Sequence, residues 1–181
     1  MPKAEDDATD RALIARWQTG DERAATLLVE RHAGALARFV ASLGQRDEVD
    51  DVVQDTFVRA FGSLDRFRSE SSLRTWLFTI ARNLVRDRVR GAKWQNRVVA
   101  IEEDHVVTEH DALDAAVADE TSERLRSAVA KLSPTQREVF TLRVGEGMSY
   151  KDIAGVAGTT EGAARVHYHN AMRAIKEFLD D

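Results

Sequence analysis

The stretch GTTEGAARVHYHNAMR, residues 158–173, carries side chains whose types and spacing suit contact with DNA. If it is helical, apolar residues lie on one side of the helix and polar residues on the other. The side chains opposite the apolar side are Arg165, Val166, His169, Asn170 and Arg173. Arginine and asparagine are the types that bond to phosphates and to base edges in the major groove. This stretch therefore predicts a DNA-contacting face.

A second set of such residues lies upstream. Arg82, Arg86 and Arg90 recur every four residues and so share one face of a helix, with Asn83 beside them. Before this helix, residues 63–72 have no helical period and read as a loop that carries one Phe and two Arg. Guanidinium groups one turn apart can hold phosphates without reading sequence.

The charges of the chain are segregated. Residues 64–97 hold nine Arg and Lys against three Asp and Glu, whereas residues 98–123 hold nine Asp and Glu and neither Arg nor Lys. The formal net charge is −5. The basic block can attract phosphates, while the net negative charge limits indiscriminate binding to nucleic acid.

Helices must position both sets, because strand signals are nearly missing and most of the chain has a helical period. The spacing of apolar residues, glycines and capping residues predicts helices over about 10–19, 22–43, 48–61, 73–90, 134–145, 150–157 and 161–179. Asp21 caps the second of these, and Ser133, Pro134 and Gln136 form a capping box. The predicted fold class is all-α.

The last two predicted helices are joined by a tight turn at Gly158, and the second is longer with a polar free side. Ser149 caps the first, and Thr159 or Thr160 caps the second. This is the pattern of a helix-turn-helix, although helical hairpins also occur in proteins that never contact DNA.

Several other classes of function are disfavoured by composition. The chain has no cysteine, no run of apolar residues long enough for a membrane span, and no signal-peptide pattern. It shows no Ser-His-Asp set, no Gly-rich phosphate loop and no paired carboxylates in a supporting context. We therefore expect a cytoplasmic protein without membrane insertion, catalytic residues, cofactor or metal site.

The motifs of this sequence, and their order along the chain, resemble those of one protein family. Residues 47–90, which include DDVVQDTF and FRSESSLRTWLFTIARN, resemble region 2 of the extracytoplasmic-function sigma factors of bacterial RNA polymerase. Residues 132–179, which include MSYKDIA, resemble their region 4. With the preceding helices the resemblance covers nearly the whole chain. It implies three parts: residues 8–97 for core polymerase and the −10 element, an acidic linker at 98–121, and residues 122–181 for the −35 element.

The resemblance also implies roles for residues in the first part. Asp51, Gln54 and Asp55 match the docking surface for the clamp helices of the largest polymerase subunit. The loop before the long helix matches the segment that captures a base flipped out of the −10 element, with Asn83 at a base-contacting position. The implied −10 residues are Phe67, Arg68, Ser69, Glu70, Ser71, Arg82, Asn83, Arg86 and Arg90. Phe67 is equally well explained as a residue that anchors the loop on the hydrophobic core. For Trp76, packing in the core is the favoured role.

In region 4 the implied −35 readers are Arg165, Val166, His169 and Asn170, with Lys151 and Arg173 as backbone contacts. The sequence departs from the family here, because Ala163 replaces the common Thr or Ser and basic residues are few. A strong contact to the common −35 sequence is therefore in doubt. The acidic linker either runs through the polymerase cleft in place of nucleic acid or is a self-repelling spacer.

The implied partners are core polymerase, through its clamp helices and the flap of its second-largest subunit, promoter DNA, and an anti-sigma factor. Two other functions stay open from the residues alone. A sigma mimic would titrate an anti-sigma factor without initiating transcription, and the sparse region 4 weakly favours it. A stand-alone helix-turn-helix regulator would bind operators without polymerase, but the near-complete region 2 match argues against it.

Overall fold

The computed structural model describes residues 2–45, 47–64, 67, 71–98 and 120–180. Every regular element in these ranges is a helix, which confirms the predicted all-α class. The N-terminal helices are α1 (Pro2–Gln18), α2 (Glu22–Ser42), α3 (Val49–Gly62) and α4 (Leu73–Val98). The C-terminal elements are α5 (Glu120–Ala130), α6 (Pro134–Phe140), the π-helical turn η2 (Thr141–Gly145), α7 (Tyr150–Ala157) and α8 (Glu161–Asp180).

Local capping chemistry sets the helix starts in the N-terminal half. The carboxylate of Asp21 accepts a hydrogen bond from the backbone N–H of Arg23, 3.1 Å away, and so caps α2 as predicted. The hydroxyl of Ser72 accepts from the backbone N–H of Thr75 at 3.1 Å, which fixes the start of α4. The exposed polar side chains of α4 are therefore held in a defined rotation from its first turn.

The helix-turn-helix has equally clear boundaries. Ser133 and Gln136 form the predicted reciprocal capping box of α6. Ser149 caps α7, which ends at Gly158 in the left-handed conformation (φ +62°) that glycine adopts without strain. Of the two threonines that could cap α8, Thr160 makes the bond, accepting from a backbone N–H at 3.1 Å.

Two helices are longer than the sequence predicts, and one was not predicted. The extended helix α1 begins at Pro2 instead of residue 10, because its acidic residues bind α2: Asp6 and Asp10 each lie 3.0 Å from the Arg31 guanidinium. Helix α4 continues to Val98 and α5 occupies Glu120–Ala130. The predicted linker, 98–121, lies almost entirely outside the described residues.

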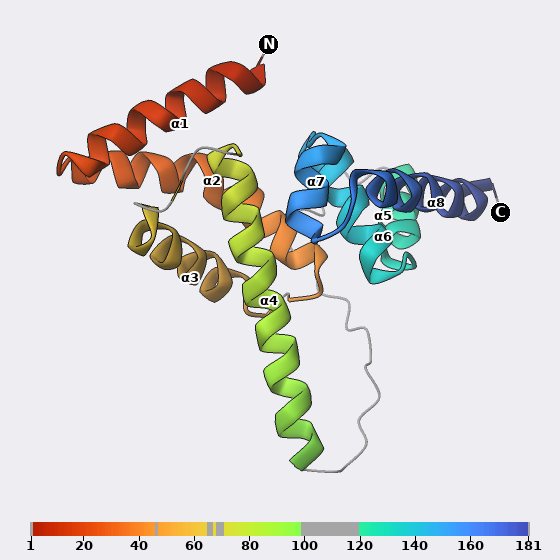
Figure 1. Ribbon diagram of the computed structural model, residues 1–181. Coiled ribbons are helices and arrows are strands. Elements are labelled where there is room, and N and C mark those ends of the chain that lie inside the picture. Colours follow the sequence, from red (N-terminus) through yellow and green to blue (C-terminus); the bar gives the residue numbers. More distant parts are fainter. Residues whose placement is uncertain (1, 46, 65–66, 68–70, 99–119, 181) are drawn as a thin grey trace.

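Helix α4 runs through the middle of the molecule, with α1 and α3 on one side and α5–α8 on the other (Figure 1). Helix α2 crosses behind α4, and the C-terminal part of α4 extends beyond the other helices. It packs against α2 and α3 and also against α7. Phe39 and Phe78 are fully buried at the centre, with ring centroids 4.9 Å apart.

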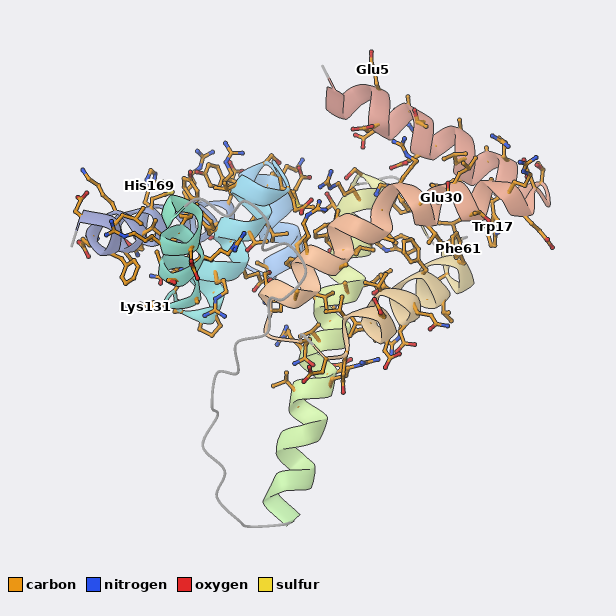
Figure 2. The ribbon with its side chains drawn as sticks, turned by 180° about the vertical axis from the view of Figure 1, so that it is seen from behind. Glu5, Trp17, Glu30, Phe61, Lys131 and His169 are labelled. Atoms are coloured by element: carbon orange, nitrogen blue, oxygen red, sulfur yellow. The ribbon has the colours of Figure 1, made fainter. Side chains whose placement is uncertain are left out.

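The main core continues from the N-terminal helices into the helix-turn-helix. Its buried residues include Val139, Leu142 and Ile153 of the C-terminal half. At the edge of the N-terminal half, the rings of Trp17 and Phe61 lie 5.4 Å apart. Figure 2 labels both residues, Trp17 on α1 and Phe61 on α3. A separate small core joins α5 to α8 through Ala128, Leu132, Ala171 and Ile175. The two halves are therefore packed together through shared apolar surface.

Candidate nucleic-acid and polymerase interface

The exposed polar face of α4 borders a groove between the two halves. Asn83, Arg86 and Arg90 are exposed, as the helical spacing predicts. With Thr135 and Glu138 of α6 they line a cavity of about 1020 Å³. Arg90 also donates to the Asp87 carboxylate at 2.6 Å. The groove thus gathers basic and amide groups that can bind phosphate or a base edge.

Arg82, predicted for the same face, is held by the C-terminal half. Its Nε donates to Oε1 of Glu138 at 2.8 Å, and the two side chains are only 16% and 8% exposed. Burial raises the pKa of the Glu138 carboxyl above its ordinary value, and attraction to Arg82 and Arg86 opposes that rise. Because desolvation offsets much of the attraction in a buried ion pair, this pair adds little to the free energy of unfolding. Its main effect is to fix the position of α6 relative to α4.

A second carboxylate of the C-terminal half reaches the N-terminal half in the same way. Glu146, in the turn after η2, has a side chain only 1% exposed. It pairs with the guanidinium of Arg74 on α4, and Arg38 Nη2 on α2 lies 3.4 Å from its Oε1. Glu138 with Arg82, and Glu146 with Arg74 and Arg38, form two separate ion-pair groups between the halves, and the two groups together are called the clasp.

The loop before α4 is described at Phe67 and Ser71, while the predicted contacts Arg68, Ser69 and Glu70 lie outside the described residues. The ring of Phe67 lies 5.1 Å from that of Trp76, and both are half-buried against the core. Phe67 also lines a cavity of about 260 Å³, so it is both an anchor of the loop and a wall of a pocket.

Two other helices also line this loop cavity. Asp7 and Arg11 belong to α1, and Lys151 and Asp152 belong to α7. Phe67 and Ser71 come from the predicted −10 loop, whereas Lys151 is a predicted −35 contact. The structure therefore brings residues expected on two separate DNA elements around one cavity.

The predicted polymerase-docking residues lie on the outer side of α3. Asp51, Gln54 and Asp55 are all exposed. Asp55 accepts a hydrogen bond at 2.8 Å from Arg88 of α4, which also bonds to Glu48 at 2.8 Å. These carboxylates raise the pKa of the Arg88 guanidinium and keep it charged. Asp51 and Gln54 remain available to a partner.

On α8, Arg165, Val166, His169 and Arg173 are exposed, as predicted, while Asn170 is half-buried. His169 stands at the outer surface of the helix in Figure 2. Arg165 is held in two ways. Its Nη2 lies 2.5 Å from Oε1 of Glu161, and its guanidinium carbon lies 4.6 Å from the ring centroid of Tyr150.

Tyr150 was not predicted as a site residue. Its ring also has the Arg143 guanidinium carbon 4.6 Å from its centroid, and the ring of Tyr168 lies 6.0 Å away. Glu138 and Glu146 were missed as well. The only sequence signals were an aromatic residue at the first position of α7, a carboxylate beside an apolar run in REVFTL, and a carboxylate between two glycines in GEGM.

Two kinds of feature are absent from the described residues. Within ranges 2–45, 47–64, 67, 71–98 and 120–180, no three His, Cys, Asp or Glu side chains gather in a way that could hold a metal ion. Over the same part of the chain, the helices are too short or too polar to cross a membrane.

Comparison with known protein families places two matches on this architecture. Residues 28–95 match the family model of sigma-70 region 2, and residues 122–175 match that of sigma-70 region 4. The first match covers most of α2 through α4, and the second covers α5 through most of α8.

Relatives also match over most of the chain. The extracytoplasmic-function RNA polymerase sigma-E factor of Haemophilus influenzae is 32% identical over 177 residues, covering 93% of this chain and 94% of its own. Among solved structures, CnrH in complex with the cytosolic domain of CnrY has a TM-score of 0.67 and 34% identity, covering 95% of this chain and 97% of that one. The sigma factor RpoE of Bartonella quintana, in complex with the anti-sigma factor NepR, has a TM-score of 0.67 and 30% identity, covering 86% and 96%.

Proposed function

Because this chain belongs to the extracytoplasmic-function sigma factors of the sigma-70 family, which direct RNA polymerase to promoters, we propose that its surfaces divide promoter recognition between two domains. The first is residues 8–97 and the second is residues 122–181, joined by the acidic linker 98–121. The polymerase carries out the chemistry, and this chain supplies neither a catalytic residue nor a cofactor or metal.

The −10 element is read by α4 and the loop before it. Asn83 contacts a base edge, and Arg86 and Arg90 hold the adjacent phosphates. Phe67 and Ser71, with the intervening loop residues, receive the flipped base. Arg82 joins these phosphate contacts once it is released from Glu138.

The −35 element is read by the exposed face of α8. Arg165 and His169 approach base edges with Val166 between them, Asn170 supports them from its half-buried position, and Arg173 and Lys151 reach phosphates. An arginine bidentate to guanine provides about 1–3 kcal/mol of discrimination, so Arg165 alone can make the element specific.

Protein partners use other faces. Asp51, Gln54 and Asp55 of α3 dock on the clamp helices of the largest subunit, and residues 122–181 bind the flap of the second-largest subunit. Both RpoE and CnrH were solved in complexes, RpoE with an anti-sigma factor. By analogy this chain has an anti-sigma partner and acts in the cytoplasm, where its polymerase is.

One observation carries this proposal: each matched domain ends in a long helix that presents an exposed face of Arg with Asn or His, α4 in one and α8 in the other. The test combines the purified chain with sigma-free core polymerase on fragmented genomic DNA and maps transcript 5′ ends. Discrete new starts that share two upstream elements are expected. Binding to core polymerase without any new start would contradict the proposal and favour the mimic.

A further inference from the structure

The first turn of α8 carries a carboxylate beside the proposed −35 readers. Glu161 is the first residue of α8, and its Oε1 accepts a hydrogen bond from Nη2 of Arg165 at 2.5 Å. The side chains of Glu161 and Arg165 are 49% and 55% exposed. The pair therefore stands at the surface, where an approaching DNA duplex can reach both side chains.

Glu161 shares one exposed face of α8 with the proposed base readers. Residues 161, 165 and 169 follow one another at four-residue spacing, so they lie along the same side of the helix. Glu161, Arg165 and His169 are all exposed, and so is Val166 beside them. The N-terminal residues of a recognition helix are the ones that contact base edges in the major groove. Glu161 therefore lies where base contacts are made.

The residues that follow Glu161 leave its carboxylate open on the outer side. Gly162 has no side chain, and among the described residues no other part of the chain comes within 4 Å of the position that a Cβ would occupy. Ala163 adds only a methyl group. A base edge can therefore approach Glu161 without meeting a bulky neighbour.

The ion pair does little for the fold itself. A solvent-exposed pair gains little free energy, because water screens the charges and two long side chains must be ordered. The start of α8 is already fixed by Thr160, whose hydroxyl accepts from the backbone N–H of Ala163 at 3.1 Å. A first-turn carboxylate also interacts favourably with the helix dipole, but that effect makes no distinction between bases. Contact with DNA gives the carboxylate a role that neither effect supplies.

A carboxylate and a guanidinium together can recognise two neighbouring bases. Arginine donates to O6 and N7 of guanine, whereas glutamate accepts from the N4 amino group of cytosine. A guanidinium has five N–H donors, so the bond to Glu161 leaves Arg165 enough donors for a guanine. An ionised carboxylate only accepts hydrogen bonds, and the acceptor oxygens of guanine and thymine repel it.

We infer that Glu161 is a specificity-determining residue of the −35 contact. Its carboxylate accepts a hydrogen bond from N4 of a cytosine in the base pair next to the guanine that Arg165 binds. One carboxylate oxygen holds the guanidinium, and the other binds the cytosine. The ring of Tyr150 supports the same guanidinium from α7, with its centroid 4.6 Å from the guanidinium carbon. This inference rests on the proposed function of α8.

The pair gives selectivity without general attraction to DNA. The charges of Glu161 and Arg165 cancel, and the carboxylate repels phosphate oxygens as well as the wrong bases. Discrimination then comes from the cost of placing an acceptor opposite the carboxylate, and not from overall affinity. This agrees with a chain whose formal net charge is −5 and whose recognition helix has few basic residues.

The test measures transcription by core polymerase with the full-length chain on a promoter library that contains every single substitution in the −35 element. The wild-type chain is expected to prefer cytosine about 5- to 50-fold at one position, next to a position that prefers guanine. Glu161→Gln is expected to shift the first preference to adenine, because a glutamine amide binds N6 and N7 of adenine. The guanine preference is expected to persist, because the amide oxygen still accepts from Arg165.

A second variant removes the group altogether. Glu161→Ala is expected to reduce the preference at the cytosine position to less than about twofold, since no acceptor remains for the N4 amino group. It is also expected to weaken the guanine preference, because Arg165 then keeps only its contact with Tyr150.

The matched control is Glu177→Gln, which removes the same charge from an exposed position near the other end of α8. A carboxylate that acted only on helix stability or general charge would change transcription from all promoters by one factor. A Glu161→Gln profile that equals the wild-type profile, or differs from it only by such a factor, would overturn the inference and leave the proposed function standing. A wild-type profile without any base preference in the −35 element would overturn the proposed function of α8, and this inference with it.

Discussion

At the scale of single residues, Arg165, a proposed DNA-reading residue of α8, is positioned by a neighbour outside its own helix. Arg165 lies against the ring of Tyr150, which also has Arg143 beside it, while Arg143 Nη1 donates to the backbone carbonyl of Met148 at 2.7 Å. An arginine loses considerable rotamer freedom when it is fixed on a base. A ring that already restricts the guanidinium reduces that cost.

Replacing Tyr150 tests this positioning role. Tyr150→Leu is expected to weaken holoenzyme binding to the −35 element by about two- to fivefold, because an exposed cation–π contact is worth about 0.5–1 kcal/mol. Tyr150→Phe keeps the ring and is expected to retain full binding. The measurement is competition between promoters with intact and altered −35 elements.

The same experiment includes a control for general damage to the fold. In an Arg165→Ala background, Tyr150→Leu is expected to cause no further loss of binding to the −35 element, since the ring acts through the Arg165 side chain. Additive losses in the double variant would contradict the positioning role of Tyr150.

A second prediction at this scale concerns the outer side of α3. Asp51 is exposed, whereas Asp55 is already paired with Arg88. Asp51→Lys is therefore expected to weaken binding to core polymerase about tenfold, because it places a like charge against a basic partner surface. The control is the equal change at Glu30, an exposed residue of α2. Equal losses of affinity for core polymerase in both variants would show that α3 does not form the interface. Surface plasmon resonance with immobilised core enzyme gives both affinities.

At the scale of elements, a buried pair helps to hold α1 on α2. Asp10 Oδ2 lies 2.9 Å from Nε2 of His32, and both side chains are less than a tenth exposed. Burial pushes the pKa of Asp10 up, but bonds and attraction from His32 and Arg31 outweigh it and leave the pKa below 3.8. The ionised carboxylate thus stabilises the docking of α1 at neutral pH.

The sign of this shift gives a pH prediction. A lowered aspartate pKa contributes stability above its unfolded value, and that contribution is lost as pH falls through the lowered pKa. Asp10→Asn is expected to cost about 1–3 kcal/mol of unfolding free energy at pH 7 and to flatten the acid dependence below about pH 4. Urea unfolding across pH measures this, with Asp7→Asn as the neighbouring control. If the unfolding free energy of Asp10→Asn falls with acid as steeply as that of the wild type, the proposed role of the Asp10 carboxylate is contradicted.

Local sequence signals predicted most of the helices and their caps, because caps and periodicity are properties of neighbouring residues. Asp21, Ser133, Ser149 and Gly158 all mark the expected boundaries. The start of α1 was misjudged because Arg31 and His32, some twenty residues away, hold its acidic side. Long-range contacts of this kind leave no local pattern.

At the scale of the whole molecule, the clasp is the feature that sequence patterns could least predict. Arg82 and Glu138 are 56 positions apart, and each is ordinary in its own helix. The helical spacing correctly grouped Asn83, Arg86 and Arg90 on an exposed face. It could not show that a second domain would cover part of that face.

The packing of the two halves against each other and the net charge of −5 together predict that the free chain binds promoter DNA poorly. In about 100 mM salt, holoenzyme is expected to bind a promoter fragment at least about 100-fold more tightly than the chain alone, since polymerase adds phosphate contacts. Fluorescence anisotropy with the same labelled fragment compares the two. Tight, specific binding by the free chain would indicate a stand-alone regulator.

The most direct test of promoter reading by two separate domains is transcription from a matrix of promoters with every single substitution in both elements. Core polymerase is supplied with the wild-type chain, Asn83→Ala or Arg165→Ala. Asn83→Ala is expected to flatten the base preference at one −10 position and leave the −35 profile intact, and Arg165→Ala to do the reverse, each by about 1–3 kcal/mol per position. Unchanged −10 base preferences with Asn83→Ala, or changes spread equally over both elements, would contradict promoter reading by two separate domains.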